Sequence, residues 1–119
     1  MNIDNLTYGE LKQIAAMFSE TKASSRIMGN GEAVIIRARD AGVHYGHLVA
    51  YDGRTVWLSN SRRMWKWFAK EGVSLSGCAT AGIDASKSKI EPVVPNITIL
   101  DACEIIYCTE AAAKTIEGA

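Results

Sequence analysis

The spacing of apolar residues changes once along the chain, from a helical period to a pattern typical of strands. Near the amino terminus, apolar residues recur at helical spacing within 11–18, and Thr7 with Glu10 forms the T-x-x-E capping box that begins a helix. The next stretch is rich in small polar residues and glycine, which indicates a loop. We therefore expect an amino-terminal helix and loop extension in residues 1–32, followed by a ligand-binding α+β domain in residues 33–119.

β-branched residues dominate from the segment AVIIRAR onward. This segment predicts a strand over 33–39, followed by a turn at Gly42. Asp52 and Gly53, between HYGHLVAY and TVWLSN, form a pair suited to positive φ and predict a hairpin turn. The segment LSNSRRMWKWF predicts that the second strand of this hairpin continues through residues 58–68.

The carboxyl-terminal part of the chain predicts two short helices around a further strand or strand pair. Ser74 can cap a helix that ends at Gly82, and Thr109 can cap a closing helix in EAAAKTI. Residues 96–108 predict the strand or strand pair, and the two prolines before it confine the preceding segment to a sheet edge or a connection. The order of elements predicts an α+β fold: a single small domain with a strongly bent antiparallel β-sheet or small barrel, an N-terminal helix, a short middle helix and a C-terminal helix.

The composition narrows the classes of protein to which the chain can belong. The 119 residues are 48% hydrophobic and 22% charged, with 13 basic and 13 acidic side chains. A net charge of zero disfavours duplex nucleic acid as a partner, because phosphate contacts favour a basic excess. No apolar run is long enough to span a membrane, and the amino terminus does not resemble a signal peptide. Three cysteines cannot all pair, so we expect reduced thiols and a cytoplasmic protein.

Histidine and cysteine do not form a metal-binding pattern. His44 and His47 differ by three positions, so on a strand they point to opposite faces. The chain also lacks C-x-x-C spacing, a nucleophile elbow and a glycine-rich phosphate loop. We therefore expect no metal, no cofactor and no catalytic residues, and we expect a binding protein rather than an enzyme.

The segment SRRMWKW is the strongest chemical signal, because it places two arginines before two tryptophans. Arg62 would share one strand face with Met64, while Arg63, Trp65 and Trp67 would share the other. Arginine can fork a phosphate, and tryptophan offers the largest ring for stacking on a base. The alternative is that the indoles fill the core while the arginines point to water.

A second charged strand supports a shared pocket. Arg37 and Arg39 are two residues apart and project from one strand face, and the following turn DAGVHYG carries His44 and Tyr45. A bent sheet would bring this turn near the arginines of SRRMWKW. Such a pocket would hold up to four guanidinium groups and several aromatic rings.

The chain resembles a known family over residues 33–118. The runs VIIRARDAGVHYGHL, SNSRRMWKWF and GVSLSGCATAG, continuing through ITILDACEIIYCTEAAAKTIEG, are similar to the first type of Thoeris anti-defence protein, a family of small phage proteins. The resemblance implies a sponge that binds and holds cyclic nucleotide immune signals without cleaving them: glycocyclic ADP-ribose isomers and, in some members, cyclic oligonucleotides. It also implies a homo-oligomer, either a dimer or a hexamer built as a trimer of dimers, with pockets at or near the subunit interface.

The resemblance also implies which residues bind the ligand. They belong to the turn after the first strand and to the arginine–tryptophan strand, and the strand pattern adds Arg39. The candidates are Arg37, Arg39, Ala41, Gly42, Val43, His44, Arg62, Arg63, Trp65 and Trp67.

Two other functions remain open from the residues themselves. The same arginines and rings suit a single-stranded nucleic acid, or a protein partner of a phage accessory factor. A hydrolase of the same signals would need a general base, for which only His44 or His47 is a candidate.

Overall fold

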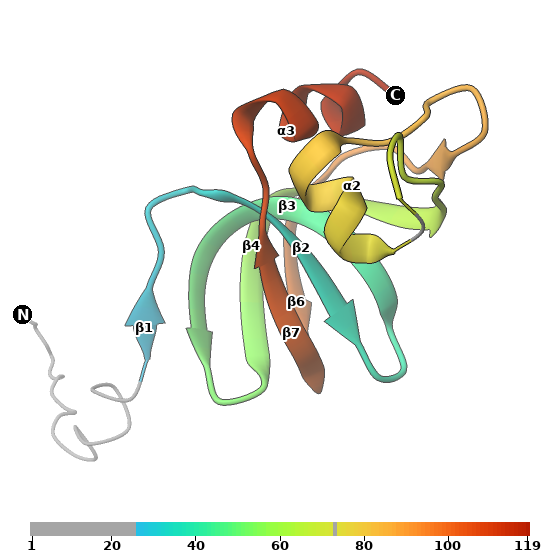
Figure 1. Ribbon diagram of the computed structural model, residues 1–119. Helices are drawn as coiled ribbons and strands as arrows, with labels where there is room; N and C mark the ends of the chain where they lie inside the picture. Colours follow the sequence, from blue (N-terminus) through green and yellow to red (C-terminus); the bar gives the residue numbers. More distant parts are fainter. Residues whose placement is uncertain (1–25, 73) are drawn as a thin grey trace, which may run out of the picture.

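The computed structural model describes residues 26–72 and 74–119, which form a bent antiparallel sheet with two helices on one side (Figure 1). The described residues form seven strands and two helices, in the following order: β1 (Ile27–Met28), β2 (Ala33–Ala38), β3 (Gly42–Asp52), β4 (Thr55–Lys66), α2 (Leu75–Ala81), β5 (Lys89–Ile90), β6 (Val94–Ile99), β7 (Ala102–Tyr107) and α3 (Glu110–Glu117). The predicted α+β class is confirmed.

The hairpin of β3 and β4 is the longest element of the fold. Asp52 pairs with Thr55 across the turn, and Gly53 takes a φ of 59°, so the predicted Asp52-Gly53 turn is confirmed. The register shifts twice along the hairpin, between Tyr45 and His47 and between Leu48 and Ala50. Such bulges increase the local twist and bend of a strand, which accounts for the curved hairpin in Figure 1.

The sheet is bent but does not close into a barrel. Its strand order is β5-β4-β3-β2-β7, with β1 added on β3 and β6 added on β4. The end strands β6 and β7 follow one another in sequence, yet no ladder joins them among residues 26–72 and 74–119. The bent sheet is therefore confirmed, whereas the barrel is not. Pro95 lies in β6, which pairs with β4 alone in the described sheet, as expected of an edge strand.

Each face of the sheet carries its own hydrophobic core. On one face, Ile35, Tyr45 and Met64 pack against α2 and α3 through Cys78 and Ile116. On the other face, the curvature of the sheet buries a second cluster between the strands. Its members are Val34, Ile36, Ala38, Leu48, Val56, Leu58, Ile99 and Ala102.

Both described helices begin at their predicted caps. The hydroxyls of Ser74 and Thr109 accept hydrogen bonds from the backbone N–H groups of Gly77 and Ala112, at 3.2 and 3.1 Å. The cap Gly82 ends α2 with a φ of 98°, as predicted. A Cβ at this position would lie 2.6 Å from Oγ1 of Thr115 in α3, so glycine also permits the close approach of the two helices.

The predicted amino-terminal helix lies outside the described residues. Within the predicted extension, Ile27 and Met28 form β1 and pair with Tyr51 and Ala50 of β3. None of the helices in residues 26–72 and 74–119 is long and apolar enough to cross a membrane.

Candidate functional site

Arg62 lies on the helix-covered face of the sheet and binds only backbone carbonyls. Its five guanidinium N–H groups are matched by five carbonyl oxygens at 2.8 to 3.3 Å. These belong to Ile90, Glu91, Ile116, Glu117 and Ala119. The guanidinium thus satisfies the last carbonyls of α3 and joins them to the end of β5 and the residue that follows it. All five donors of Arg62 are engaged within the chain, so the structure gives no support to the prediction that Arg62 forks a phosphate.

The other predicted residues of β4 do not converge. Arg63 is exposed and lies opposite His44. Trp65 is 66% exposed, with the Lys89 ammonium 5.9 Å from its ring centroid. Trp67 follows the end of β4 and packs against the core that contains Met64. The two indoles, predicted on one strand face, therefore have separate environments.

Arg37, the arginine of β2, does not share a face of the sheet with Arg63 of β4. Arg37 pairs with Val43, whereas Arg63 pairs with His44, and successive residues of β3 point to opposite faces. Arg37 and Arg63 consequently project from opposite faces of the sheet. The Nε of Arg37 donates to Oε1 of Glu104 at 3.0 Å. The expected pocket of four guanidinium groups is not formed.

The turn between β2 and β3 positions His44 rather than a bound phosphate. Gly42 has a φ of 85° and begins β3 beside Val43. The carbonyl of Ala41 accepts a hydrogen bond from Nε2 of His44 at 2.9 Å. Arg39 is exposed, and its backbone N–H donates to the carbonyl of Asp101.

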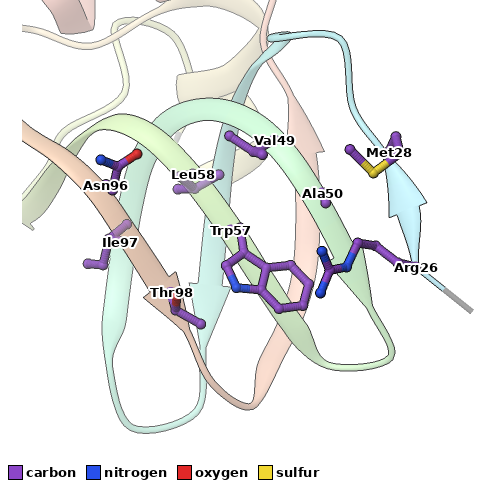
Figure 2. A pocket seen from close by; sticks show the side chains of 9 residues that line it. All are labelled: Arg26, Met28, Val49, Ala50, Trp57, Leu58, Asn96, Ile97 and Thr98. Carbon is purple, nitrogen blue, oxygen red and sulfur yellow. The ribbon is translucent and has the colours of Figure 1, made fainter. Parts of the chain in front are cut away.

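An arginine and a tryptophan do meet elsewhere, in an open groove of about 280 Å³ (Figure 2). Residues of β1, β3, β4 and β6, together with the residue before β1, line it. They are Arg26, Met28, Val49, Ala50, Trp57, Leu58, Asn96, Ile97 and Thr98. We call this surface the Arg26–Trp57 groove.

The groove combines a cation, a flat ring and polar edges. The Arg26 guanidinium carbon lies 4.5 Å from the centroid of the Trp57 ring, within cation–π range. Trp57 pairs with Thr98 of β6, and Asn96 follows on the same strand face. Figure 2 shows the guanidinium beside the indole, with Thr98 on the adjacent strand. This arrangement can bind a molecule that is both anionic and flat.

Sequence reasoning missed both central residues of the groove. Arg26 falls in a stretch interpreted as a loop, and its neighbours in the fold are distant in sequence. Trp57 alternates with Val56 and Leu58, which are both buried. That alternation was the available signal, because it places the large indole on the less buried face of the strand.

A second cavity of about 280 Å³ contains Tyr45, His47 and Glu117. The Tyr45 hydroxyl donates to Oε2 of Glu117 at 2.5 Å, and Nε2 of His47 lies 3.2 Å from the same oxygen. Burial, followed by the bond to Glu117, raises the pKa of Tyr45, so its hydroxyl stays protonated and donates. These contacts tie the end of α3 to β3. His44 and His47, the two candidate bases, lie in different cavities.

Comparison with known proteins assigns a family. Residues 31–116 match the model of a domain of unknown function, DUF6948, and the chain belongs to that family. No curated protein and no solved structure gives a significant match.

Proposed function

We propose that this protein binds and sequesters a small cyclic nucleotide in the Arg26–Trp57 groove, without cleaving it. The observation that carries the proposal is the Arg26 guanidinium over the Trp57 ring in an open groove. The ligands to test first are those implied by the sequence resemblance: glycocyclic ADP-ribose isomers and cyclic di- and trinucleotides. In this role the protein is a phage anti-defence protein in the host-cell cytoplasm.

Each part of the groove has a task in this proposal. Arg26 is exposed and donates to a phosphate, while the Trp57 ring stacks on a base. Asn96 and Thr98 are exposed at the edge and offer hydrogen bonds to a sugar or a second phosphate. Met28 and Val49, which are 66% and 41% exposed, supply apolar contact area.

The contacts that one copy of the groove offers are too few for tight binding, which favours a homo-oligomer. One charged hydrogen bond contributes about 1.5–3 kcal/mol and one base–aromatic stack about 1–3 kcal/mol. Their sum of roughly 2.5–6 kcal/mol, before the cost of association, gives only a weak affinity, about tens of micromolar at best. Holding a scarce signal needs more contacts, so we propose that a second copy of the chain completes the groove in a dimer or larger ring.

The proposal is tested by binding a panel of ligands and recovering the bound molecule. Calorimetry with cyclic ADP-ribose isomers, cyclic dinucleotides and cyclic trinucleotides should identify one saturable ligand class. Heat release should then return that ligand intact, and recovery of a cleaved product would contradict sequestration. Affinity that grows with oligonucleotide length and falls steeply with salt would instead favour the single-stranded nucleic-acid factor.

Matched variants locate the site. Arg26→Gln and Trp57→Leu should each weaken binding of the identified ligand about tenfold or more, because each removes roughly 1.4 kcal/mol or more of contact. The control pair Arg39→Gln and Trp65→Leu changes the same residue types at exposed positions outside the groove and should leave affinity within about twofold. The reverse result would place the ligand outside the Arg26–Trp57 groove.

A further inference from the structure

His44 and Ser61 are buried polar residues that share a small cavity. Each is 1% exposed, in a fold whose other fully buried side chains, among the described residues, are almost all apolar. The cavity has a volume of about 130 Å³ and lies where β3 and β4 meet the segment before β6. Its lining residues are His44, Ser61, Arg63, Glu91, Pro92, Val94 and Ile97. We call it the His44–Ser61 cavity.

The hydrogen bonds of His44 determine which atom faces a ligand as an acceptor. Nε2 lies 2.9 Å from the Ala41 carbonyl, which can only accept, so Nε2 carries the proton. Burial lowers the pKa of His44, an effect that the Ala41 bond and Glu91 oppose and Arg63 reinforces. The imidazole is therefore neutral near pH 7, and Nδ1 presents a lone pair.

Neither Nδ1 of His44 nor Oγ of Ser61 has a hydrogen-bond partner within residues 26–72 and 74–119. Buried polar atoms are paired in the large majority of cases, so two unpaired atoms in one cavity ask for an explanation. Packing alone does not require a hydroxyl at position 61. Alanine would fill nearly the same space without burying an unpaired polar group. Ordered water that bonds to both atoms would account for them, and so would a ligand that pairs with both.

The backbone is shaped to bring Ser61 into this cavity. The register changes between His47 opposite Ser59 and Tyr45 opposite Arg62, and Asn60 takes a φ of 47°. This bulge reverses the alternation of β4, so Ser61 shares the face of His44. Gly46 permits the packing here, since a Cβ would lie 2.9 Å from Cδ1 of Leu58.

The donors and acceptors of the cavity favour a neutral ligand. Ser61 and Arg63 can donate, whereas Nδ1 of His44 and the Glu91 carboxylate can accept. An anion would face the carboxylate and the lone pair, and a cation would face the guanidinium. A hydroxyl donates and accepts through one atom, so two adjacent hydroxyls best match a cavity that presents both donors and acceptors. The volume is slightly below that of a cavity able to hold benzene, about 150 Å³, so it admits a small fragment rather than a whole nucleotide.

We propose that the His44–Ser61 cavity binds a vicinal diol, in which one hydroxyl donates to Nδ1 of His44 and its neighbour bonds to Oγ of Ser61. The diol can come from a glycerol-type polyol or from the edge of a sugar ring. This cavity adjoins the Arg26–Trp57 groove, with which it shares Ile97, and the proposal does not rest on which ligand that groove takes.

The experiment follows the ¹⁵N resonance of His44 Nδ1 in the full chain. Titration runs to about 100 mM, because two neutral hydrogen bonds give only weak affinity. Glycerol, 1,2-propanediol and D-ribose are the diol probes, and the response to glycerol against ribose distinguishes polyol from sugar. A saturable shift with at least one of them, and none with 1,3-propanediol, supports the proposal. A saturable shift only with acetamide or inorganic phosphate overturns it, as does the absence of saturation with every diol.

Ser61→Ala provides the matched variant. Removing an unpaired buried hydroxyl should leave Tm unchanged or raise it by a few degrees, about 4 °C per kcal/mol or more. The same variant should weaken the diol affinity about two- to tenfold, which corresponds to one lost neutral hydrogen bond. A lower Tm would mean that the hydroxyl is already paired, and an unchanged diol response would mean that it does not contact the ligand. Either result would overturn the proposal.

Discussion

The end of β4 and the Arg26–Trp57 groove contain the same side-chain types and use them in opposite ways. At the end of β4, Arg62 donates all five N–H groups to carbonyls, and Trp67 packs against a core. In the groove, Arg26 is exposed and lies over a half-buried Trp57. Arg62 and Trp67 of the denser cluster therefore stabilise the fold, while the pair separated in sequence faces an open surface. Adjacency of arginine and tryptophan does not by itself make a binding site.

The largest expected effect is the loss of stability in Arg62→Ala. The substitution leaves five carbonyls without their donor, so we expect the free energy of unfolding to fall by about 3 kcal/mol. Urea denaturation measures this change. Arg26→Ala and Arg63→Ala replace exposed arginines and should each change stability by about 0.5–1 kcal/mol or less. If all three variants were equally stable, the contrast between the backbone-bonded Arg62 and the exposed arginines would fail.

An intermediate effect is expected at Tyr45, which holds the same end of α3 through a side chain. Tyr45→Phe removes the hydrogen bond to Glu117 and should lower the free energy of unfolding by about 1–2 kcal/mol. Chemical denaturation again gives the value. His47→Gln changes the second side chain that contacts Oε2 of Glu117. It should lower the free energy of unfolding by less than Tyr45→Phe does, since His47 is only partly buried. A larger loss from His47→Gln than from Tyr45→Phe would contradict the assigned geometry.

The smallest effect is expected from the titration of His44. Its pKa is lowered below the unfolded value of 6.5, so the unfolded chain binds more protons in this range. The free energy of unfolding therefore has its full value, as far as His44 is concerned, above pH 6.5. It decreases as the pH falls from 6.5 through the folded pKa. The Ala41 bond and the Glu91 charge partly offset burial and the Arg63 charge, which keeps the effect small. Denaturation between pH 7.5 and about 5 measures it, and a His44→Gln chain should lack this slope.

Local patterns made much of the fold predictable. The Asp52-Gly53 turn, the Ser74 and Thr109 caps and the strand at the start of the domain depend on a few neighbouring residues and were all confirmed. The barrel was not confirmed. Closure of a sheet depends on whether its end strands pair, and this pairing cannot be predicted from a local sequence pattern.

The candidate site was less predictable, because its contacts join distant residues. Alternation along β4 correctly separates Arg62 from Arg63, but it does not show which partners the fold brings to each face. The partners of Arg62 are 28 to 57 positions away, so no window around SRRMWKW contains them. Arg26 lies over Trp57 because β1 pairs with β3. A strand of two residues leaves no recognisable pattern in the sequence, so this pairing could not be predicted.

The sequence by itself determined the turns, the helix caps and the alternation that produces an α+β domain, since each depends on residues within a few positions. Only the tertiary structure decided which arginine is bonded to the backbone, which indole is accessible and which polar atoms are left unpaired in a cavity. The physical reason is that a guanidinium or a hydroxyl binds whatever donor or acceptor the folded chain brings within about 3 Å. That partner is selected by strand register and bending, not by the neighbours in the sequence.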